Sequence, residues 1–408
     1  MAAAGPMSLE SRQQSVGQKP ALGWSGWNQG GCNAASASVA LATAQSFVSR
    51  GLKDAGYTYV NIDDCWSLKQ RDSSGNLVPD PSKWPNGIKA VSDQIHNMGL
   101  KFGLYGDNGL MTCAGYPGSQ GYEQKDANLL ASWGVDFWKY DNCYTPCNLA
   151  GPPQTCPNNQ APNSRPRYET MRNALKNTNR PILYSLCNWG YDKVWTWGAE
   201  VGQIWRMSTD NWGGWQDVVN IANWAAPIAN YSKPYGFNDL DMMIIGNGKL
   251  TAAQERTHFA IWAIAKSPII LGTDISKLSS TQIALVMNKV LLLSTIGHVC
   301  LFLLGDLLAV NQDSLGLAAT TFTPRGTTPP GSSNMPPYWA GTLSDGIVVA
   351  LVASTGAATM SVNFADVPGL GSGTFTWKEL LTGKQGTGTS VSAQLAQHDV
   401  AVFKVKKA

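Results

Sequence analysis

A lysine and a carboxylate lie two positions apart at the end of an apolar run near the middle of the chain. The run at 134–138 is short and rich in β-branched and aromatic residues, which predicts a buried strand. Asp141 falls where this strand meets its loop, and Lys139 lies on the same face. A carboxylate is costly to bury unpaired, so a lysine that keeps it ionised favours a nucleophile. The alternative is a structural ion pair at the end of a strand.

Acidic residues also end several other apolar runs. These residues are Asp63, Asp64, Asp107, Asp210, Asp239 and Asp241. Packing does not readily explain acidic side chains at the carboxyl ends of several successive strands. We therefore expect them to share one polar pocket.

Such a pocket needs a scaffold that gathers the ends of many strands. From about residue 21 to 272, short apolar runs alternate with amphipathic patterns, which is typical of repeated βα units and a parallel sheet. The predicted strands lie near 21–24, 57–62, 101–105, 135–140, 181–185, 203–207, 235–239 and 268–271. The predicted helices include 36–55, 87–98, 122–133, 167–177, 215–229 and 252–266. Eight units close an α/β (β/α)8 TIM barrel, whose active site lies at the carboxyl ends of the strands.

The amino-acid composition and the hydrophobic pattern of the chain change beyond residue 312. Pro, Gly, Ser and Thr cluster at 320–337, and alternating segments such as 346–351 and 400–405 follow. These segments predict antiparallel strands of a small β-sandwich. We therefore predict a disordered segment at 1–19, a catalytic barrel at 20–316 and a C-terminal β-sandwich at 317–408.

Composition narrows the functional classes. The 408 residues carry a net charge of +3, and 14% of them are charged, so there is no basic stripe for nucleic acid. The four histidines are scattered and the eight cysteines lack the spacing of a zinc ribbon, so we expect no metal and no cofactor. Sixteen tryptophans and thirteen tyrosines offer flat rings to a sugar, although packing in the core explains most of them.

Two segments are unusual. Residues 290–305 carry no charged side chain, but they are shorter than the roughly 20 residues that span a bilayer, so we expect no membrane insertion. Residues 1–19 are polar and hold no apolar core of the kind a signal peptide needs. Cysteines beside the acidic strand ends nevertheless suit disulfides formed in an oxidising compartment.

The motifs around these residues resemble those of the α-galactosidases of glycoside hydrolase family 27, of the fungal and plant type. The resemblance covers nearly everything from Pro20 to the carboxyl terminus. The matching motifs occur in family order, at 22–24, 61–66, 113–119, 139–143, 206–210 and 238–242.

The resemblance implies a retaining glycoside hydrolase that removes terminal α-D-galactosyl residues from oligosaccharides, galactomannans or galactolipids. Asp141 would be the nucleophile and Asp210 the general acid/base of a double displacement. Two further activities on the same scaffold are alternatives, namely an α-N-acetylgalactosaminidase and a β-L-arabinopyranosidase. From another class, a catalytically inactive sugar-binding protein is possible.

The resemblance also implies which residues hold the sugar. Asp63 and Asp64 would accept hydrogen bonds from the 4- and 6-hydroxyls, and Trp189 would leave no room for a 2-acetamido group. We favour a substrate contact for Arg206, because an arginine paired only with the acid/base would hold it ionised. The remaining residues expected around the sugar are Trp24, Tyr105, Lys139, Cys187 and Asp241.

By the same resemblance, disulfides would join Cys32 to Cys65, Cys113 to Cys143, and Cys147 to Cys156, which leaves Cys187 as a thiol in the pocket. Residues 290–305 look inserted relative to the family, and we predict that they are a translated intron or an annotation error rather than an evolved element. Family members of this type are usually secreted, so we expect an extracellular protein whose translation start lies upstream or was misassigned.

Overall fold

A computed structural model describes residues 16–145, 163–288, 306–328 and 331–408. The chain divides into two compact units. The first holds the chain up to Thr209 together with Tyr235–Asp239, and the second holds Asp210–Pro234 and Leu240–Ala408.

Seven parallel strands organise the first unit. They are β1 (Leu22–Ser25), β2 (Tyr59–Asn61), β3 (Lys101–Asp107), β4 (Phe137–Asp141), β5 (Leu183–Leu186), β6 (Ile204–Arg206) and β7 (Phe237–Asp239). Each strand pairs with its neighbour in chain order, and nearly all of their residues are buried. Strands that are buried on both faces need continuous apolar runs, and this is the pattern that predicted them.

The eighth strand, β8 (Ile269–Leu271), completes the sheet order β7-β6-β5-β4-β3-β2-β1-β8. Within the second unit, Met243 forms a parallel bridge with Leu271 of β8. Eight parallel strands in this order confirm the predicted (β/α)8 fold.

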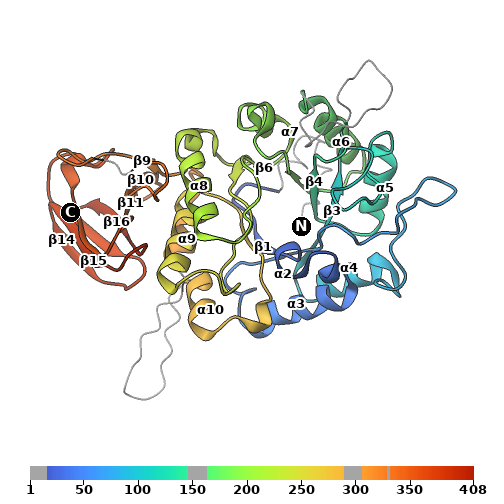
Figure 1. Cartoon of the computed structure of the whole chain (residues 1–408), viewed down its shortest axis with the longest axis horizontal. Coiled ribbons are helices and arrows are strands. Elements are labelled where there is room, and N and C mark those ends of the chain that lie inside the picture. The colour runs from blue at the N-terminus through green and yellow to red at the C-terminus, as the bar shows by residue number, and fades with distance from the viewer. Residues whose placement is uncertain (1–15, 146–162, 289–305, 329–330) are drawn as a thin grey trace, which may run out of the picture. The chain divides into compact units, whose positions relative to one another are not determined.

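Helices alternate with these strands, and Figure 1 shows α5 and α6 beside β3 and β4. Ser36 caps α3 through the Val39 amide, and Thr251 forms a capping box with Gln254 at α9. The α-helices are α2 (Trp27–Gly30), α3 (Ala37–Ser49), α4 (Gly87–Asn97), α5 (Glu123–Ser132), α6 (Arg165–Asn177), α7 (Gly198–Val201), α8 (Trp215–Ala225), α9 (Ala252–Ile264), α10 (Ser280–Met287) and α11 (Asp306–Asn311). The 3₁₀ helices are η1 (Gly31–Ala34), η3 (Tyr191–Thr196), η4 (Ala226–Tyr231), η5 (Ile275–Lys277) and η6 (Phe364–Asp366).

Two predicted helices are shorter in the structure by four residues or more. The first ends at Ser49 rather than at residue 55, since Gly51 adopts a left-handed backbone with φ of 77°. The helix predicted at 215–229 becomes a 3₁₀ helix after Ala225, where Pro227 cannot donate a backbone hydrogen bond.

The C-terminal residues of the second unit form antiparallel sheets, drawn in orange and red in Figure 1. A six-stranded sheet has the order β14-β13-β16-β11-β10-β9, and a two-stranded sheet joins β12 to β15. A common apolar core includes Val349, Phe364 and Phe403. The predicted β-sandwich is thereby confirmed. Its strands are β9 (Thr320–Thr321), β10 (Tyr338–Leu343), β11 (Gly346–Val352), β12 (Ala358–Asn363), β13 (Phe375–Glu379), β14 (Gln385–Gly388), β15 (Ser390–Leu395) and β16 (Val400–Lys407).

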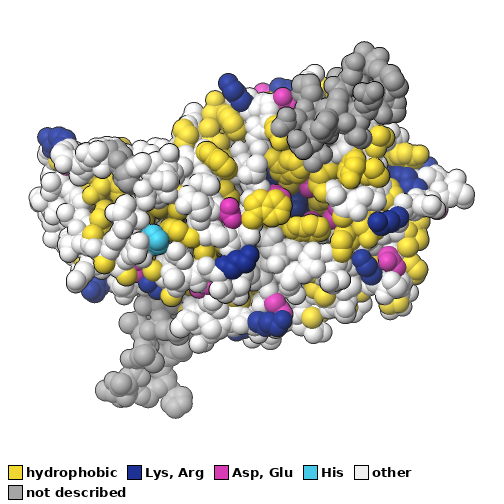
Figure 2. Space-filling model, viewed as in Figure 1, with side chains coloured by type: hydrophobic (Ala, Val, Ile, Leu, Met, Phe, Trp, Pro, Cys, Tyr) yellow, Lys and Arg dark blue, Asp and Glu magenta, His cyan; other side chains and the backbone are white. Residues whose placement is uncertain are grey.

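Several predictions concern residues outside the described ranges. They include residues 1–15 of the disordered segment predicted at 1–19, the disulfide between Cys147 and Cys156, and the insertion at 290–305. The domain boundary between 316 and 317 also stays a prediction. Within the described residues, no helix has both the length and the apolar character that a membrane span requires. On the face drawn in Figure 2, Lys and Arg side chains are scattered among neutral and hydrophobic ones.

Candidate active site

Asp141 is the last residue of β4, so the end of the strand places its side chain at the start of the following loop. The Tyr105 hydroxyl donates to Oδ2 of Asp141 at 2.9 Å, and the Asn142 amide donates to Oδ1 at 2.9 Å. Asp141 is only 6% exposed. The two donors hold both oxygens of this buried carboxylate in place.

Lys139 pairs with the carboxylate of Asp63 and is within electrostatic range of Asp141. Its ammonium donates to Oδ2 of Asp63 at 2.8 Å, and it lies 5.2 Å from the centre of the Tyr105 ring. Burial disfavours the charged lysine, but nearby negative charges outweigh this effect and raise the pKa of Lys139 well above its ordinary value; the charge of Asp63 contributes most, followed by Cys187 and Asp141. Lys139 therefore acts on Asp141 through its charge while it hydrogen-bonds to Asp63.

Replacement of Lys139 by methionine is expected to lower the free energy of unfolding by about 3 to 5 kcal/mol, because it leaves the Asp63 carboxylate buried without its cation. A lysine with a raised pKa stabilises the fold below its unfolded pKa of about 10.4, so the loss should be complete at neutral pH. Urea unfolding at pH 7 measures this.

The matched control is Lys89→Met. Lys89 pairs with Asp93 four residues on, but both side chains are more than half exposed. Its loss should change stability by less than about 0.5 kcal/mol. Equal losses in the two variants would mean that the Lys139 pair is an ordinary surface ion pair.

Asp63 and Asp64 follow β2 and are both almost fully buried. The Ser25 hydroxyl donates to Oδ2 of Asp63 at 3.1 Å, and the Asp64 amide donates to Oδ1 of Asp63 at 3.0 Å. Asp64 in turn accepts from the amides of Cys65 at 2.7 Å and Ala114 at 2.9 Å. Burial raises the pKa of Asp64, although these amide donors oppose the shift. The two carboxylates are thus fixed in orientation.

Asp107 was noted in the sequence as a strand end but was given no role. It is fully buried, and it accepts from the amides of Gly109 at 2.8 Å and Cys143 at 2.9 Å. Burial and then the charge of Asp141 raise its pKa well above the ordinary value. A side chain at Gly109 would collide with the Cys143 carbonyl, so the loops after β3 and β4 approach closely here. Asp107 therefore holds the backbone next to Asp141.

Two disulfides brace these loops. Cys32 is joined to Cys65, and Cys113 is joined to Cys143. These are the pairs that the family resemblance implied. Each bond links the loop after one strand to the loop after the next strand in the sheet.

The ends of β5 and β6 supply three of the residues expected around the sugar, namely Cys187, Trp189 and Arg206. Cys187 is a buried thiol, and Arg206 directs Nη1 toward its sulfur at 3.8 Å. Nη2 of Arg206 donates to the Ser208 carbonyl at 3.3 Å. Trp189 is partly exposed, has a left-handed backbone with φ of 61°, and lies 6.2 Å from the Tyr191 ring. Three of the predicted residues therefore lie on neighbouring strand ends.

Trp24 lies in β1 and is completely buried. The first unit thus contains most of the predicted substrate-binding residues as well as the predicted nucleophile. They are Trp24, Asp63, Asp64, Tyr105, Lys139, Asp141, Cys187, Trp189 and Arg206.

Asp210 and Asp241 lie in the second unit. Asp210 is half-buried and follows β6 by four residues. The Asn211 amide donates to Oδ2 of Asp241 at 2.7 Å, and the Trp262 indole donates to the Asp241 carbonyl at 2.8 Å. The carboxylate of Asp241 therefore fixes the backbone immediately after Asp210.

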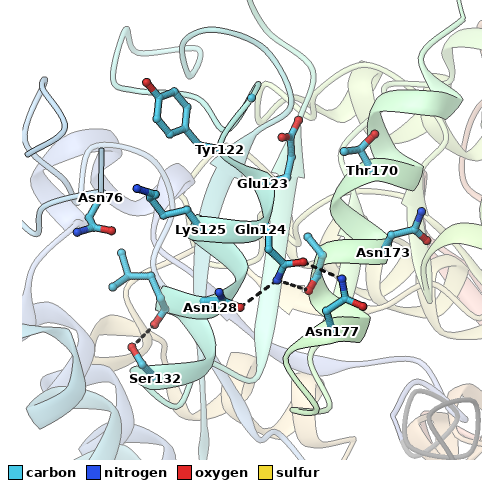
Figure 3. A pocket seen from close by; sticks show the side chains of 13 residues that line it. Asn76, Tyr122, Glu123, Gln124, Lys125, Asn128, Ser132, Thr170, Asn173 and Asn177 are labelled. Carbon is cyan, nitrogen blue, oxygen red and sulfur yellow. Dashed lines mark hydrogen bonds between the residues drawn. The ribbon is translucent and has the colours of Figure 1, made fainter. Parts of the chain in front are cut away.

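A cavity of about 820 Å³ lies elsewhere in the first unit, and sequence reasoning did not foresee it. Figure 3 shows that α5 and α6 supply most of its lining. Five of its thirteen lining residues carry side-chain amides, among them Asn128, Asn173 and Asn177, and Tyr122 also lines it. None of the predicted site residues lines this cavity.

Comparison with known proteins adds independent evidence. Residues 19–295 match a family model described as alpha galactosidase A, and residues 334–405 match one described as the alpha galactosidase C-terminal beta sandwich domain. A probable alpha-galactosidase B of Penicillium simplicissimum is 40% identical over 97% of this chain and 95% of its own length.

Solved structures of alpha-galactosidases superpose on this chain over nearly its whole length. Alpha-galactosidase I from Mortierella vinacea superposes with a TM-score of 0.84 at 33% identity, covering 97% of this chain and 98% of its own. An alpha-galactosidase from Saccharomyces cerevisiae, solved with raffinose, gives a TM-score of 0.81 at 28% identity, covering 97% and 99%.

Proposed function

This chain belongs to the α-galactosidase family, and we propose that it cleaves terminal α-D-galactosyl residues with retention of configuration. The observation that carries the proposal is the setting of Asp141. It is a buried carboxylate at a barrel strand end, with Tyr105 and a backbone amide on its oxygens and the Lys139 charge nearby.

In the first step, an oxygen of Asp141 attacks the anomeric carbon as the bond to the leaving oxygen breaks. Asp210 gives its proton to that oxygen, so the leaving group departs as a neutral alcohol. The product is a β-linked galactosyl ester of Asp141. Before the attack, the Tyr105 hydroxyl stabilises the negative charge of the Asp141 carboxylate by donating to Oδ2. The same hydrogen bond orients the carboxylate toward the substrate.

In the second step, Asp210 is ionised and acts as the base. It takes a proton from water as the water oxygen attacks the anomeric carbon, and the bond to Asp141 breaks. The product is α-galactose, the Asp141 carboxylate is regenerated, and Asp210 is again protonated. Two inversions give net retention.

Asp63 and Asp64 suit recognition of the galactose 4- and 6-hydroxyls. Their fixed carboxylate oxygens can accept hydrogen bonds from hydroxyl groups, and burial makes an unpaired oxygen costly. Glucose carries its 4-hydroxyl in the other orientation and would leave an acceptor unpaired. This penalty favours galactose. Trp24 and Tyr105 line the galactose ring, and Asp241 is the last of the proposed substrate-binding residues.

Hydrolysis of an aryl α-galactoside tests the proposed activity directly. The aryl α-N-acetylgalactosaminide and the aryl β-L-arabinopyranoside, offered in parallel, test the alternatives on the same scaffold. Preference for either of these substrates would contradict the assignment. Turnover of none of the three would favour an inactive sugar-binding protein.

Trp189 is proposed to exclude a 2-acetamido group from the pocket, with Cys187 and Arg206 beside it. Trp189→Ala is expected to raise the ratio of kcat/KM for the aryl α-N-acetylgalactosaminide over the galactoside by about tenfold or more, because it removes the bulk that blocks the larger substituent. Steady-state kinetics on both substrates measure this ratio.

The matched control is Tyr191→Ala, which removes the neighbouring ring without opening the 2-position. Its substrate ratio should stay at the wild-type value. An unchanged ratio in Trp189→Ala would place the selectivity in other residues.

The two disulfides support an oxidising location, and we infer that the protein works outside the cell. Mass measurement of alkylated protein from its source tests this inference. Protein that is cytosolic, with all four of these cysteines reduced, would contradict it.

A further inference from the structure

Trp212 is 72% exposed, the largest exposed fraction among the large hydrophobic side chains of the described residues. A tryptophan normally buries most of its ring, because the ring is the largest apolar surface that a side chain offers. Trp212 also lies two residues after Asp210. An exposed indole beside the proposed general acid calls for a ligand that covers it.

The backbone beneath this ring is held in place from several directions. The Asn211 amide donates to Asp241 at 2.7 Å, and the Asn211 side chain donates to the Met242 carbonyl at 3.3 Å and accepts from the Gly213 amide at 3.2 Å. Both neighbours of Trp212 are therefore anchored.

The adjacent loop adds two more contacts. Asn247 donates to the Gly213 carbonyl at 3.3 Å, and Lys249 donates to the carbonyl of Trp212 itself at 3.5 Å. Gly213 has a φ of 98°, a conformation that other residues rarely adopt. The loop thus presents an exposed ring on a fixed backbone, which is the arrangement of a preorganised contact.

The chemistry of Asp210 identifies what the ring meets. A general acid must come within about 2.6 to 3.2 Å of the oxygen that it protonates, so the leaving group begins beside Asp210. Two residues of extended chain span at most about 7 Å, roughly the width of one pyranose ring. The C–H face of a pyranose is apolar and carries slightly positive hydrogens, which match the electron-rich face of indole.

We propose that Trp212 is the platform for the leaving-group saccharide, the sugar attached to the galactose that is cleaved. The proposal rests on the proposed function, since it needs Asp210 as the acid. The same platform holds a sugar that replaces water in the second step, so it also controls transfer of galactose to a sugar acceptor.

The test compares two substrates with different leaving groups. In galactosyl-α-1,6-glucose the leaving group is a sugar that can cover the indole, whereas in α-galactosyl fluoride it is a single atom. Trp212→Ala is expected to lower kcat/KM for the disaccharide about tenfold and to leave kcat/KM for the fluoride unchanged. Trp212→Phe should recover part of the loss.

The matched control is Trp224→Ala, which removes another exposed tryptophan, on α8, that is 49% exposed. It should behave as wild type on both substrates. A second measurement is the yield of galactosyl transfer to added glucose, which should fall in Trp212→Ala and stay unchanged in Trp224→Ala.

The outcomes separate the two proposals. If the wild type cleaves the fluoride and Trp212→Ala loses nothing on the disaccharide, or loses equally on both substrates, the platform is wrong and the proposed function stands. If the wild type cleaves neither substrate, the proposed function fails and the platform fails with it.

Discussion

Replacement of Asp141 by alanine is expected to lower kcat for an aryl α-galactoside roughly 10⁴-fold or more. The variant lacks the oxygen that forms the galactosyl ester, and water at that position is a far weaker nucleophile. The hydrogen-bond donors of Tyr105 and Asn142 remain, but they have no carboxylate to orient.

An external nucleophile identifies the role more sharply than the loss of rate does. Azide is small enough to enter the space that the Asp141 carboxylate leaves. Attack from that side is a single inversion, so an α-galactoside with a dinitrophenyl leaving group should give β-galactosyl azide. Proton NMR of the product distinguishes the two anomers.

Asp136→Asn is the control for Asp141→Ala. Asp136 lies just before β4, at the opposite end of the same strand, and contacts His96, Arg180 and the Phe102 amide. Residues at that end of a barrel strand contribute to stability rather than to chemistry. The folded fraction of the Asp136→Asn variant should keep the kcat of the wild type. Full activity in Asp141→Ala, or rescue to the α-azide, would refute the nucleophile assignment.

Replacement of Asp210 by alanine is expected to have an effect that depends on the leaving group. For an alkyl or sugar leaving group, which needs a proton, the rate of the first step should fall about 10²- to 10⁴-fold. A dinitrophenolate departs without protonation, so the first step should then be nearly unchanged. The galactosyl-enzyme should accumulate, because no base activates water, and a burst of dinitrophenolate reports it.

Azide should again rescue this variant, but with the opposite stereochemistry. It needs no general base, and it attacks the β-linked galactosyl ester from the α face, so the product is α-galactosyl azide. A β-azide from Asp210→Ala would exchange the roles of the two aspartates. An equal loss of rate for every leaving group would remove Asp210 from proton transfer altogether.

The barrel could be predicted from the sequence because its strands are buried on both faces. Such strands need unbroken apolar runs, and all eight runs match strands in the structure. Helix ends were less predictable, since they depend on single residues such as Gly51, whose positive φ follows the end of α3.

The partners of the site residues were harder to foresee. Lys139 and Asp141 are close in sequence, which suggested that they pair. The structure gives Lys139 a hydrogen bond to Asp63, which lies 76 positions away in the chain. Neighbours across a parallel sheet come from distant segments, so a single strand cannot reveal them.

Asp107 and Trp212 were missed for a different reason. A buried aspartate that accepts backbone amides and an aspartate that binds substrate look the same in sequence, so nothing local separated Asp107 from Asp63. The type of a residue also does not determine how far its side chain is exposed to solvent. Only the structure reveals that Trp212 faces solvent.

The two disulfides have a consequence for the biosynthesis of the protein. Their cysteines, Cys32 with Cys65 and Cys113 with Cys143, are separated by only 33 and 30 positions. All four therefore precede Asp210 in the order of synthesis. At about 5 to 20 residues per second, a ribosome adds Asp210 roughly 3 to 13 seconds after Cys143. In an oxidising compartment, the two disulfides around the proposed nucleophile can therefore form before the proposed acid/base has been synthesised.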